Sequence, residues 1–306
     1  MRTFCPEGWL TKNSENKKTT LSPTTLAEAE ATGEIMEGIV TMCDSNYNLI
    51  VQLGCMKGII PKFEGAIGVT DGKTRDIALI SRVGKPVCFV VNAIKVDGCG
   101  RLYAELSRRK AQERCMRYIK TNKGVGSVIN ARITHLESFG AFCDIGCGII
   151  ALLPIDSISV SRISHPRDRF DVGDDIRVVI KSIDEDGKIT LSHKELLGTW
   201  MENAALFSAG QTVSGIIRSV EDYGVFVELT PNLAGLAEPK RDAFIGQKAS
   251  VYIKSIIPEK MKVKLIIIDS FEGEHSKEFK YFTDAEKLTK WQYSPEDCPK
   301  LIVSVF

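Results

Sequence analysis

The sequence predicts a mainly β protein made of three tandem five-stranded barrels that are joined by short helices. Three observations lead to this fold class. One pattern of aromatic, glycine and apolar residues occurs three times along the chain. Each copy continues with the same succession of turn residues and short apolar runs. The segments between the copies are typical of helices, the first by its good helix formers and lack of proline and the second by its apolar spacing. Short alternating strands with turn signals between them are typical of small closed barrels.

The repeated pattern is clearest in residues 134–146, where two phenylalanines stand on either side of a glycine. Glycine at such a point lets a strand bulge or pack closely on its neighbour. The pattern returns about 84 residues later, which is a repeat period and not a chance match. A weaker copy lies upstream. The aligned aromatic positions are Tyr47 and Ile50, Phe139 and Phe142, and Tyr223 and Phe226.

Each copy then continues in the same way. A short apolar run follows the aromatic positions, then a strand anchored by a glycine, then a turn and a final strand. The apolar runs lie at 57–61, 150–154 and 234–238, the glycine-anchored strands begin at 83–87, 172–176 and 245–249, and the final strands cover 102–106, 189–191 and 263–266. Five strands in roughly 70 residues fit an OB-fold barrel.

This combination resembles the S1 RNA-binding domain, which is named after the large mRNA-binding protein of the small ribosomal subunit. The resemblance covers about two thirds of the chain as three copies, far more than a lone short motif. The length, the three copies and the helical linkers look like the short S1 proteins of Gram-positive bacteria. The resemblance implies OB-fold barrels that bind single-stranded RNA, such as mRNA, in translation.

The predicted boundaries follow from these repeats. They are a polar N-terminal segment with a short helix at 1–33, a degenerate first barrel at 34–107, a basic linker helix at 108–123, a second barrel at 124–194, a linker helix at 195–209, a third barrel at 210–269 and a C-terminal tail at 270–306.

The helices carry recognisable start signals. Ser22 followed by Pro23 predicts the N-terminus of a short helix, and Ser107 is a candidate N-cap for the first linker helix. The second linker has Leu196, Leu197, Trp200, Ala204 and Phe207 at helical spacing, which favours packing between barrels. Residues 1 to about 25 are too polar to order themselves by burial of apolar area. The apolar end of the tail is expected to form a strand or to dock on a barrel.

Composition limits the possible functions. The chain has 306 residues, 43% of them hydrophobic, and 40 basic against 39 acidic side chains, so any attraction for nucleic acid must come from local patches. Nine cysteines without a paired framework indicate a reducing cytoplasm. Cys143 and Cys147 are the only close pair, and two half-buried thiols are favoured over a metal site. No apolar stretch is long enough to span a membrane, and the first ten residues lack the apolar core of a signal peptide.

Single-strand binding needs aromatic rings for the bases and positive charge for the phosphates. The resemblance puts Phe139, Phe142, Tyr223 and Phe226 on the exposed RNA face, whereas burial in the barrel core is the alternative. Carried over by position, the family's basic residue on the last strand falls on Lys188 and Lys262, with Arg177 and Lys254 as secondary contacts. One departure weakens the third barrel, because Pro61, Pro154 and Glu238 stand where the family commonly has histidine, and Glu238 would repel phosphate. The second barrel is therefore the expected main site.

Two further groups of cations are candidates for phosphate contact. The excursion at 157–170 of the second barrel carries His165 and Arg167. The stretch 101–123 has the largest local excess of positive charge, including Arg108, Arg109 and Lys110. A solvated helix face is an equally good interpretation of this second cluster.

No catalytic motif is present: there is no glycine-rich phosphate loop, no nucleophile elbow and no metal-ligand pattern on a helix. The sequence therefore predicts a non-catalytic protein without cofactor or metal. Its expected partners are single-stranded RNA and, through the first barrel, proteins of the small ribosomal subunit. An adaptor whose barrels mainly contact proteins away from the ribosome stays open as the alternative.

Overall fold

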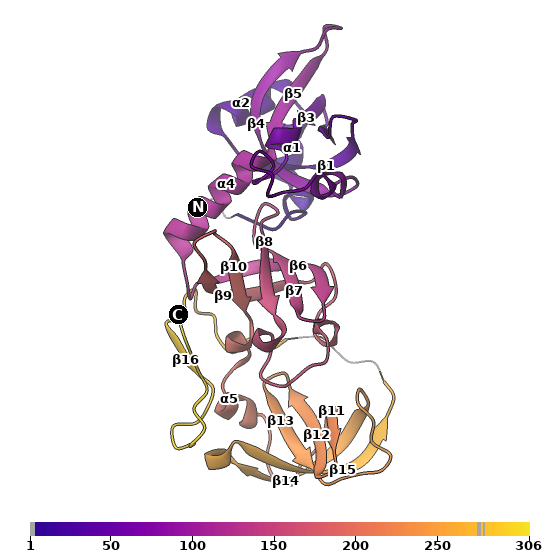
Figure 1. Ribbon diagram of the computed structural model, residues 1–306, viewed down its shortest axis with the longest axis vertical. Coiled ribbons are helices and arrows are strands. Elements are labelled where there is room, and N and C mark those ends of the chain that lie inside the picture. The colour runs from indigo at the N-terminus through magenta and orange to yellow at the C-terminus, as the bar shows by residue number, and fades with distance from the viewer. Residues whose placement is uncertain (1–3, 274–276, 278) are drawn as a thin grey trace. The chain divides into compact units, whose positions relative to one another are not determined.

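The computed structural model describes residues 4–273, 277 and 279–306, and these residues form three closed five-stranded barrels (Figure 1). The expected mainly β fold class is confirmed. The strands of the first barrel are β1 (Met36–Cys43), β2 (Leu49–Gln52), β3 (Lys57–Ile60), β4 (Pro86–Val96) and β5 (Leu102–Ser107). Those of the second are β6 (Val128–Glu137), β7 (Gly140–Asp144), β8 (Ile150–Pro154), β9 (Asp175–Ile183) and β10 (Ile189–Ser192). The third barrel has β11 (Thr212–Glu221), β12 (Gly224–Thr230), β13 (Leu233–Ala237), β14 (Lys248–Ile257) and β15 (Lys262–Phe271).

All three barrels close in the same order, with the fifth strand between the third and the fourth. The third and fifth strands pair in parallel, as in β3 with β5, β8 with β10 and β13 with β15. The first strand bends at a register shift, between Val40 and Met42 in β1 and between Ile217 and Ser219 in β11. Such bulges increase local twist, which helps a short sheet to close on itself.

The chain divides into two compact units. The first contains residues 1–124, 130–132 and 144–150, and the second contains the remaining residues up to 306. The predicted boundaries lie between whole barrels. This division instead assigns the turn after β7, which belongs to the second barrel, to the first unit. The second unit holds the complete third barrel, the linker before it and the C-terminal tail.

Residues 10–20 of the N-terminal segment form helical structure, so the expectation that residues 1 to about 25 cannot order themselves is wrong for this part. The segment forms a 3-10 turn (Leu10–Lys12) and α1 (Ser14–Thr20). Polar contacts hold it in place: the Asn16 side chain bonds both the N–H and the C=O of Glu37, and the Glu37 carboxylate accepts from the N–H groups of Gly8 and Thr11. The composition of the segment could not predict these contacts, because they are made with Glu37, more than twenty residues further along the chain.

The predicted starts of two helices are confirmed. In α2 (Pro23–Thr32) the Ser22 hydroxyl accepts from the N–H of Thr24, and Pro23 opens the helix. In α4 (Arg108–Tyr118) the Ser107 hydroxyl accepts from the N–H of Lys110. A short α3 (Ile77–Ile80) lies between β3 and β4. Further short turns of helix are at Lys62–Glu64, Ile119–Lys123, Ile155–Ser157, Pro166–Asp168 and Pro258–Lys260.

The second linker is not one continuous helix. It consists of a 3-10 turn (Lys194–Leu197) and α5 (Trp200–Ala204), separated at Gly198, whose φ of +83° is outside the helical range. Thr199 then caps α5 through a capping box with Glu202. The expected packing role is confirmed for Leu196, Leu197, Trp200 and Ala204, which are buried.

The C-terminal tail both forms strands and docks on a barrel. Its strands β16 (Lys290–Gln292) and β17 (Val303–Val305) pair with each other, and Trp291 and Tyr293 lie in the apolar core of the third barrel. Earlier in the tail, the ring of Phe279 packs against Phe170 and His193 of the second barrel. Among the described residues, no helix is long and apolar enough to cross a membrane.

Candidate nucleic-acid interface

An aromatic pair stands at the start of β12 in the third barrel. Tyr223 occupies the turn between β11 and β12 and is 67% exposed, and Phe226 is half-buried on β12. Their ring centroids are 6.2 Å apart and their planes meet at 87°. The exposed Tyr223 ring can stack on a base, and the half-buried Phe226 ring packs against it and supports its position.

The second barrel repeats this arrangement. Phe139 is 54% exposed, Phe142 is half-buried on β7, and their rings meet at 89° with centroids 6.0 Å apart. A third ring, which the sequence analysis missed, extends the surface: His135 on β6 stacks on Phe142 at 6.2 Å and 28°. The Nε2 of His135 lies 2.6 Å from the Glu137 carboxylate. Only the pairing of β6 with β7 brings His135 to this place, so its position in the sequence gave no signal.

The glycine between the aromatic positions has a steric reason. A Cβ on Gly140 would lie 2.5 Å from the carbonyl oxygen of Leu153, and one on Gly224 would lie 2.5 Å from that of Ala237. The second strand therefore approaches the third more closely than any side chain at that point allows. This close approach fixes where the flanking rings emerge.

Beside Tyr223 and Phe226, the third barrel has a groove of about 660 Å³. The groove is lined by apolar side chains, among them Leu236 and Met261, and by one carboxylate, Glu238, which lies 4.0 Å from Lys254. Five lysines line it: Lys254, Lys260, Lys262, Lys264 and Lys300. Two of them, Lys254 and Lys262, are residues that the resemblance pointed to.

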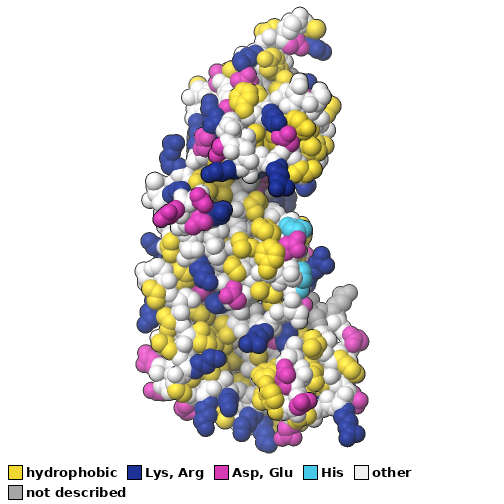
Figure 2. Space-filling model, in the orientation of Figure 1, with side chains coloured by type: hydrophobic (Ala, Val, Ile, Leu, Met, Phe, Trp, Pro, Cys, Tyr) yellow, Lys and Arg dark blue, Asp and Glu magenta, His cyan; other side chains and the backbone are white. Residues whose placement is uncertain are grey.

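The other three lysines of this groove were missed as site residues. The alternating basic stretch from Glu259 to Lys264 did contain the signal for Lys260 and Lys264. Lys300 belongs to the tail, whose docking could not be placed from the sequence. Over the face shown in Figure 2, basic and acidic side chains are interspersed. The positive charge is thus local to the groove.

The candidate cations of the second barrel are exposed or have partners within the chain. Lys188 is exposed in the turn before β10, where its Nζ lies 3.7 Å from Asp186. Arg177 holds the tail, since it donates to the carbonyl of Thr283 and its guanidinium lies over the Tyr281 ring. His165 caps the turn Pro166–Asp168, with its Nδ1 accepting from the N–H of Arg167. The Arg167 side chain is exposed.

Two basic side chains at the start of the linker, Arg108 and Arg109, are paired with acidic partners. Arg108 is only 4% exposed, and its guanidinium donates to both oxygens of Glu7 at 2.7 and 3.0 Å. The expectation that Arg108 contacts phosphate is therefore wrong, because the side chain is buried in an ion pair. Arg109 pairs with Glu64 and Glu113. Lys110 is exposed and donates to the side chain of Asn92.

The first barrel has no aromatic pair. Ile50 is buried, and Tyr47 adopts a left-handed backbone conformation with φ of +62°. The Nζ of Lys62 lies 4.5 Å from the centre of the Tyr47 ring and covers that face. One face of the Tyr47 ring is thus not available for stacking in this barrel.

The cysteine pair of the second barrel is fully buried and not half-buried as expected. The two thiols also have different hydrogen-bond partners. Cys143 contacts the carbonyl of Ala141, whereas hydrogen bonds with Cys115 and Cys88 lower the pKa of the Cys147 thiol to about 5. Among the residues that the structure describes, no group of three or more potential ligands is arranged to hold a metal ion.

Comparisons with known proteins agree with this architecture. Residues 123–194 match the family model of the S1 RNA binding domain. The chain is 33% identical over 154 residues to small ribosomal subunit protein bS1 of Leuconostoc lactis, a match covering 46% of this chain and 36% of that protein. It is 32% identical over 155 residues to the bS1 homolog of Bacillus subtilis, covering 49% and 39% of the two chains.

The matched part spans less than two fifths of the length of these curated relatives. A crystal structure of a multidomain protein with nucleic acid binding domains from Streptococcus pneumoniae aligns with 79% of this chain and 76% of its own, at 16% identity and a TM-score of 0.25. That likeness is too low to add to the assignment. The repeat pattern, the barrels and the family match together identify residues 123–194 as an S1 RNA-binding domain, in a chain that is similar to small ribosomal subunit protein bS1 over about half of its length.

Proposed function

We propose that this protein is a non-catalytic binder of single-stranded RNA whose main contact surface is the groove of the third barrel. The observation that carries the proposal is the convergence of Tyr223 and Phe226 with five lysines on one groove. The second barrel supplies a further stacking surface from His135, Phe139 and Phe142. The domain match at residues 123–194 and the relatives support the same class of ligand.

Binding would combine two physical contributions. Each base stacked on an exposed ring contributes roughly 1–3 kcal/mol, without strong sequence preference, because every base has a flat apolar face. Each phosphate contact by a lysine releases counterions, so affinity falls as salt rises. The Tyr223 ring is the most exposed of the four aromatic side chains and is the first expected platform.

Glu238 reduces this attraction but does not cancel it. Its carboxylate lies 4.0 Å from Lys254. The other cations of the groove have no carboxylate within 4.0 Å among the described residues: Lys260, Lys262, Lys264 and Lys300. The third barrel therefore replaces the second as the proposed main site. In the second barrel, Lys188, Arg167 and the surface around Phe139 remain proposed secondary contacts.

The relatives suggest the cellular setting. Because they are small ribosomal subunit proteins, we infer that this protein binds mRNA in translation, in the cytoplasm. The first barrel, which has no aromatic pair, would serve contact with proteins of the small subunit. Phe63, Ile77 and Ile80, all in the excursion between β3 and β4, are exposed and could form that contact.

Titration of a fluorescent pyrimidine-rich single strand tests the proposal. The wild type should bind at micromolar protein, with affinity falling between about 50 and 200 mM salt. The double variant Lys262→Gln with Lys264→Gln should bind more weakly and depend less on salt. The matched control, Lys287→Gln with Lys290→Gln, changes two exposed lysines of the tail outside the groove. Absence of wild-type binding, or equal effects of the two double variants, would refute the assignment.

An adaptor protein is the second candidate. The observation in its favour is the exposed apolar side chains of the first barrel, together with the missing aromatic pair. In that case Phe63→Ala with Ile77→Ala would abolish association with a ribosomal partner, whereas the lysine variants of the third barrel would leave it intact. Sedimentation with purified small subunits distinguishes the adaptor from the RNA binder. If the protein associates with the subunit through RNA, the lysine variants of the third barrel lose this association and the first-barrel variant keeps it.

A further inference from the structure

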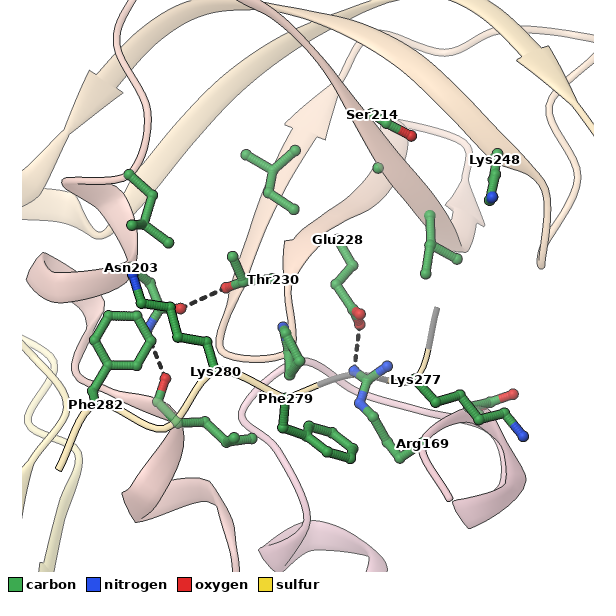
Figure 3. A pocket seen from close by; sticks show the side chains of 17 residues that line it. Arg169, Asn203, Ser214, Glu228, Thr230, Lys248, Lys277, Phe279, Lys280 and Phe282 are labelled. Carbon is green, nitrogen blue, oxygen red and sulfur yellow. Dashed lines mark hydrogen bonds and ion pairs between the residues drawn. The ribbon is translucent and has the colours of Figure 1, made fainter. Parts of the chain in front are cut away.

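In the second unit, polar side chains around the cavity of Figure 3 bond to one another. The Arg169 guanidinium donates to the Glu228 carboxylate at 2.5 Å, and the Thr230 hydroxyl donates to the Asn203 side chain at 2.6 Å (Figure 3). Pairs of this kind hold the fold together. The first unit contains a different kind of buried group, because four of its cysteines lie close together, and thiols can be modified covalently.

The four cysteines come from four separate segments of the first unit: Cys5 from the N-terminal segment, Cys88 from β4, Cys115 from α4 and Cys147 from the turn after β7. Cys88 and Cys115 each form a side-chain hydrogen bond with Cys147, and all three side chains are buried. Cys5 is half-buried, and its carbonyl oxygen accepts from the N–H of Cys147 at 2.9 Å. Cys147 therefore lies at the centre of this thiol cluster.

The backbone at Cys147 is strained. Its φ is +51°, and the residues on either side, Gly146 and Gly148, have φ of +141° and +74°. Glycine adopts such angles freely, whereas a residue with a Cβ does so at a cost in free energy. A third glycine would fit this turn with less strain. Because strained backbone positions cluster at functional sites, the strain at Cys147 points to a role for its thiol.

The surroundings of Cys147 favour its charged form. Hydrogen bonds with Cys115 and Cys88 lower the pKa of its thiol to about 5. The Arg108 guanidinium adds to this effect, while burial and Glu7 oppose it. The hydrogen bond to Cys147, together with burial, raises the pKa of the Cys115 thiol. The thiolate is the nucleophilic form of cysteine, so Cys147 is the group that reacts first with an oxidant.

Of the two neighbouring thiols, Cys115 is the better partner for a covalent bond to Cys147. The turn packs closely on α4, since a Cβ on Gly146 would lie 2.8 Å from the Cys115 sulfur. The Cys88 sulfur lies 3.3 Å from the Glu37 carboxylate, to which its thiol donates. One thiol hydrogen cannot donate to both acceptors at once. Glu37 therefore competes with Cys147 for Cys88, which leaves Cys115 as the expected partner.

We propose that Cys147 is a site of oxidation by hydrogen peroxide and that the oxidised residue forms a disulfide with Cys115. The Cys147 thiolate attacks one peroxide oxygen, the O–O bond breaks and hydroxide leaves, which gives a sulfenic acid. The Cys115 sulfur then attacks the sulfenic sulfur. The S–O bond breaks, and the hydroxyl group leaves as water with the proton of the Cys115 thiol. The two sulfurs lose two electrons, which reduce one peroxide to one water and one hydroxide.

The N-terminal segment covers the reactive sulfur, because the backbone of Cys147 is bonded to that of Cys5. Hydrogen peroxide is little larger than water, so a local opening of this segment admits it. The disulfide then fixes the turn after β7 to α4 within the first unit. Reduction by a dithiol restores both thiols.

Peroxide treatment of the full chain, with each cysteine followed by alkylation in denaturant and mass spectrometry, tests this inference. Cys147 should lose its thiol at least about tenfold faster than Cys143, because its thiolate fraction is larger. Cys143 is the matched control, since it is equally buried but belongs to the second unit. The main product should be a pair of peptides linked through Cys147 and Cys115, and dithiothreitol should restore both thiols.

Two variants separate the roles of the two sulfurs. Cys115→Ser keeps a hydrogen-bond donor but cannot form the disulfide, so the sulfenic acid of Cys147 should persist and react with dimedone. In Cys147→Gly, which suits the left-handed backbone, Cys115 should be oxidised no faster than Cys143. Cys298→Ser, which changes a half-buried cysteine of the tail, should form the disulfide like the wild type. Thermal unfolding checks that each variant keeps the fold.

Three results with the wild type would overturn the inference, and none of them depends on how a variant folds. The first is oxidation of Cys147 no faster than that of Cys143. The second is a main disulfide that joins Cys147 to Cys5 or Cys88. The third is a Cys147 thiol that stays reduced under conditions that oxidise the exposed Cys99.

Discussion

Tyr223 and Phe226 meet edge to face in the third barrel, with ring centroids 6.2 Å apart and planes at 87°. The inner ring supports the edge of the outer ring, which leaves a face of Tyr223 open to a base. Edge-to-face pairs are favourable in themselves. The platform is therefore positioned before any ligand arrives.

Tyr223→Ala should weaken binding of a single strand by about 1–3 kcal/mol, because it removes one stacking surface. Tyr223→Phe should bind almost like the wild type, since the flat ring is kept. Fluorescence anisotropy with a pyrimidine-rich strand measures both. Phe63→Ala is the matched control, since Phe63 is 55% exposed but lies in the first barrel. Equal losses at Tyr223 and Phe63 would contradict a specific stacking role.

Glu238→Gln should raise the affinity for RNA. The carboxylate lies in the lysine groove, and its removal ends repulsion of phosphate and frees Lys254. The gain should be below about 1 kcal/mol, because Glu238 and Lys254 are well exposed and screened by salt. It should also shrink at high salt. Glu259→Gln, an exposed acid outside the groove lining, is the control, and an equal gain there would show a general charge effect.

Arg108→Gln should destabilise the first unit by up to about 3–5 kcal/mol, because it removes the nearer cation of the buried Glu7 carboxylate and leaves Arg82, whose Nη1 lies 3.6 Å away. Arg117→Gln, on an exposed position of the same helix, should change stability by less than about 0.5 kcal/mol. Chemical denaturation compares the two. If Arg108→Gln keeps full stability but loses RNA affinity, the original assignment to phosphate contact would be restored.

Acidification should destabilise the second unit through His193. Burial lowers the pKa of this imidazole from 6.5 to about 4. Its Nδ1 donates to the carbonyl of Ile158, and its Nε2 accepts from the Tyr281 hydroxyl. The unfolded chain therefore takes up a proton below pH 6.5 that the folded chain refuses until about pH 4.

The resulting stability is present above pH 6.5 and is lost as the pH falls toward 4, by up to about 3 kcal/mol, since one pKa unit is about 1.4 kcal/mol. Denaturation of the wild type and of His193→Gln at several pH values in this window measures the difference. The variant starts less stable but should lose less on acidification. Parallel losses in the two proteins would show that other groups dominate.

Local patterns predicted the architecture well. The alternating strands, the glycine between the aromatic positions and the Ser22 and Ser107 caps depend on neighbours in sequence, and all are found in the structure. The break at Gly198 was missed because the apolar stripe on both sides of it suggested a continuous helix.

The site could be predicted only where its residues share one strand or hairpin. Phe139, Tyr223 and Lys262 belong to such local patterns, whereas Lys300 reaches the groove only through the docked tail. The prediction that Arg108 contacts phosphate was wrong for the opposite reason. The sequence shows its charge, but its burial depends on an ion pair with Glu7, about a hundred residues away. Composition cannot distinguish a cation that is free from one that is already paired.

The tail that packs on His193 through Tyr281 and enters the third core through Trp291 and Tyr293 joins the second and third barrels in one compact unit. On the proposed function, an RNA strand bound by one of these barrels would meet the other at a high effective concentration, as a second step within the same molecule. Two weak contacts of this kind would give a higher overall affinity than either alone. Because each contact would dissociate separately, the strand would be able to shift along the protein without complete release.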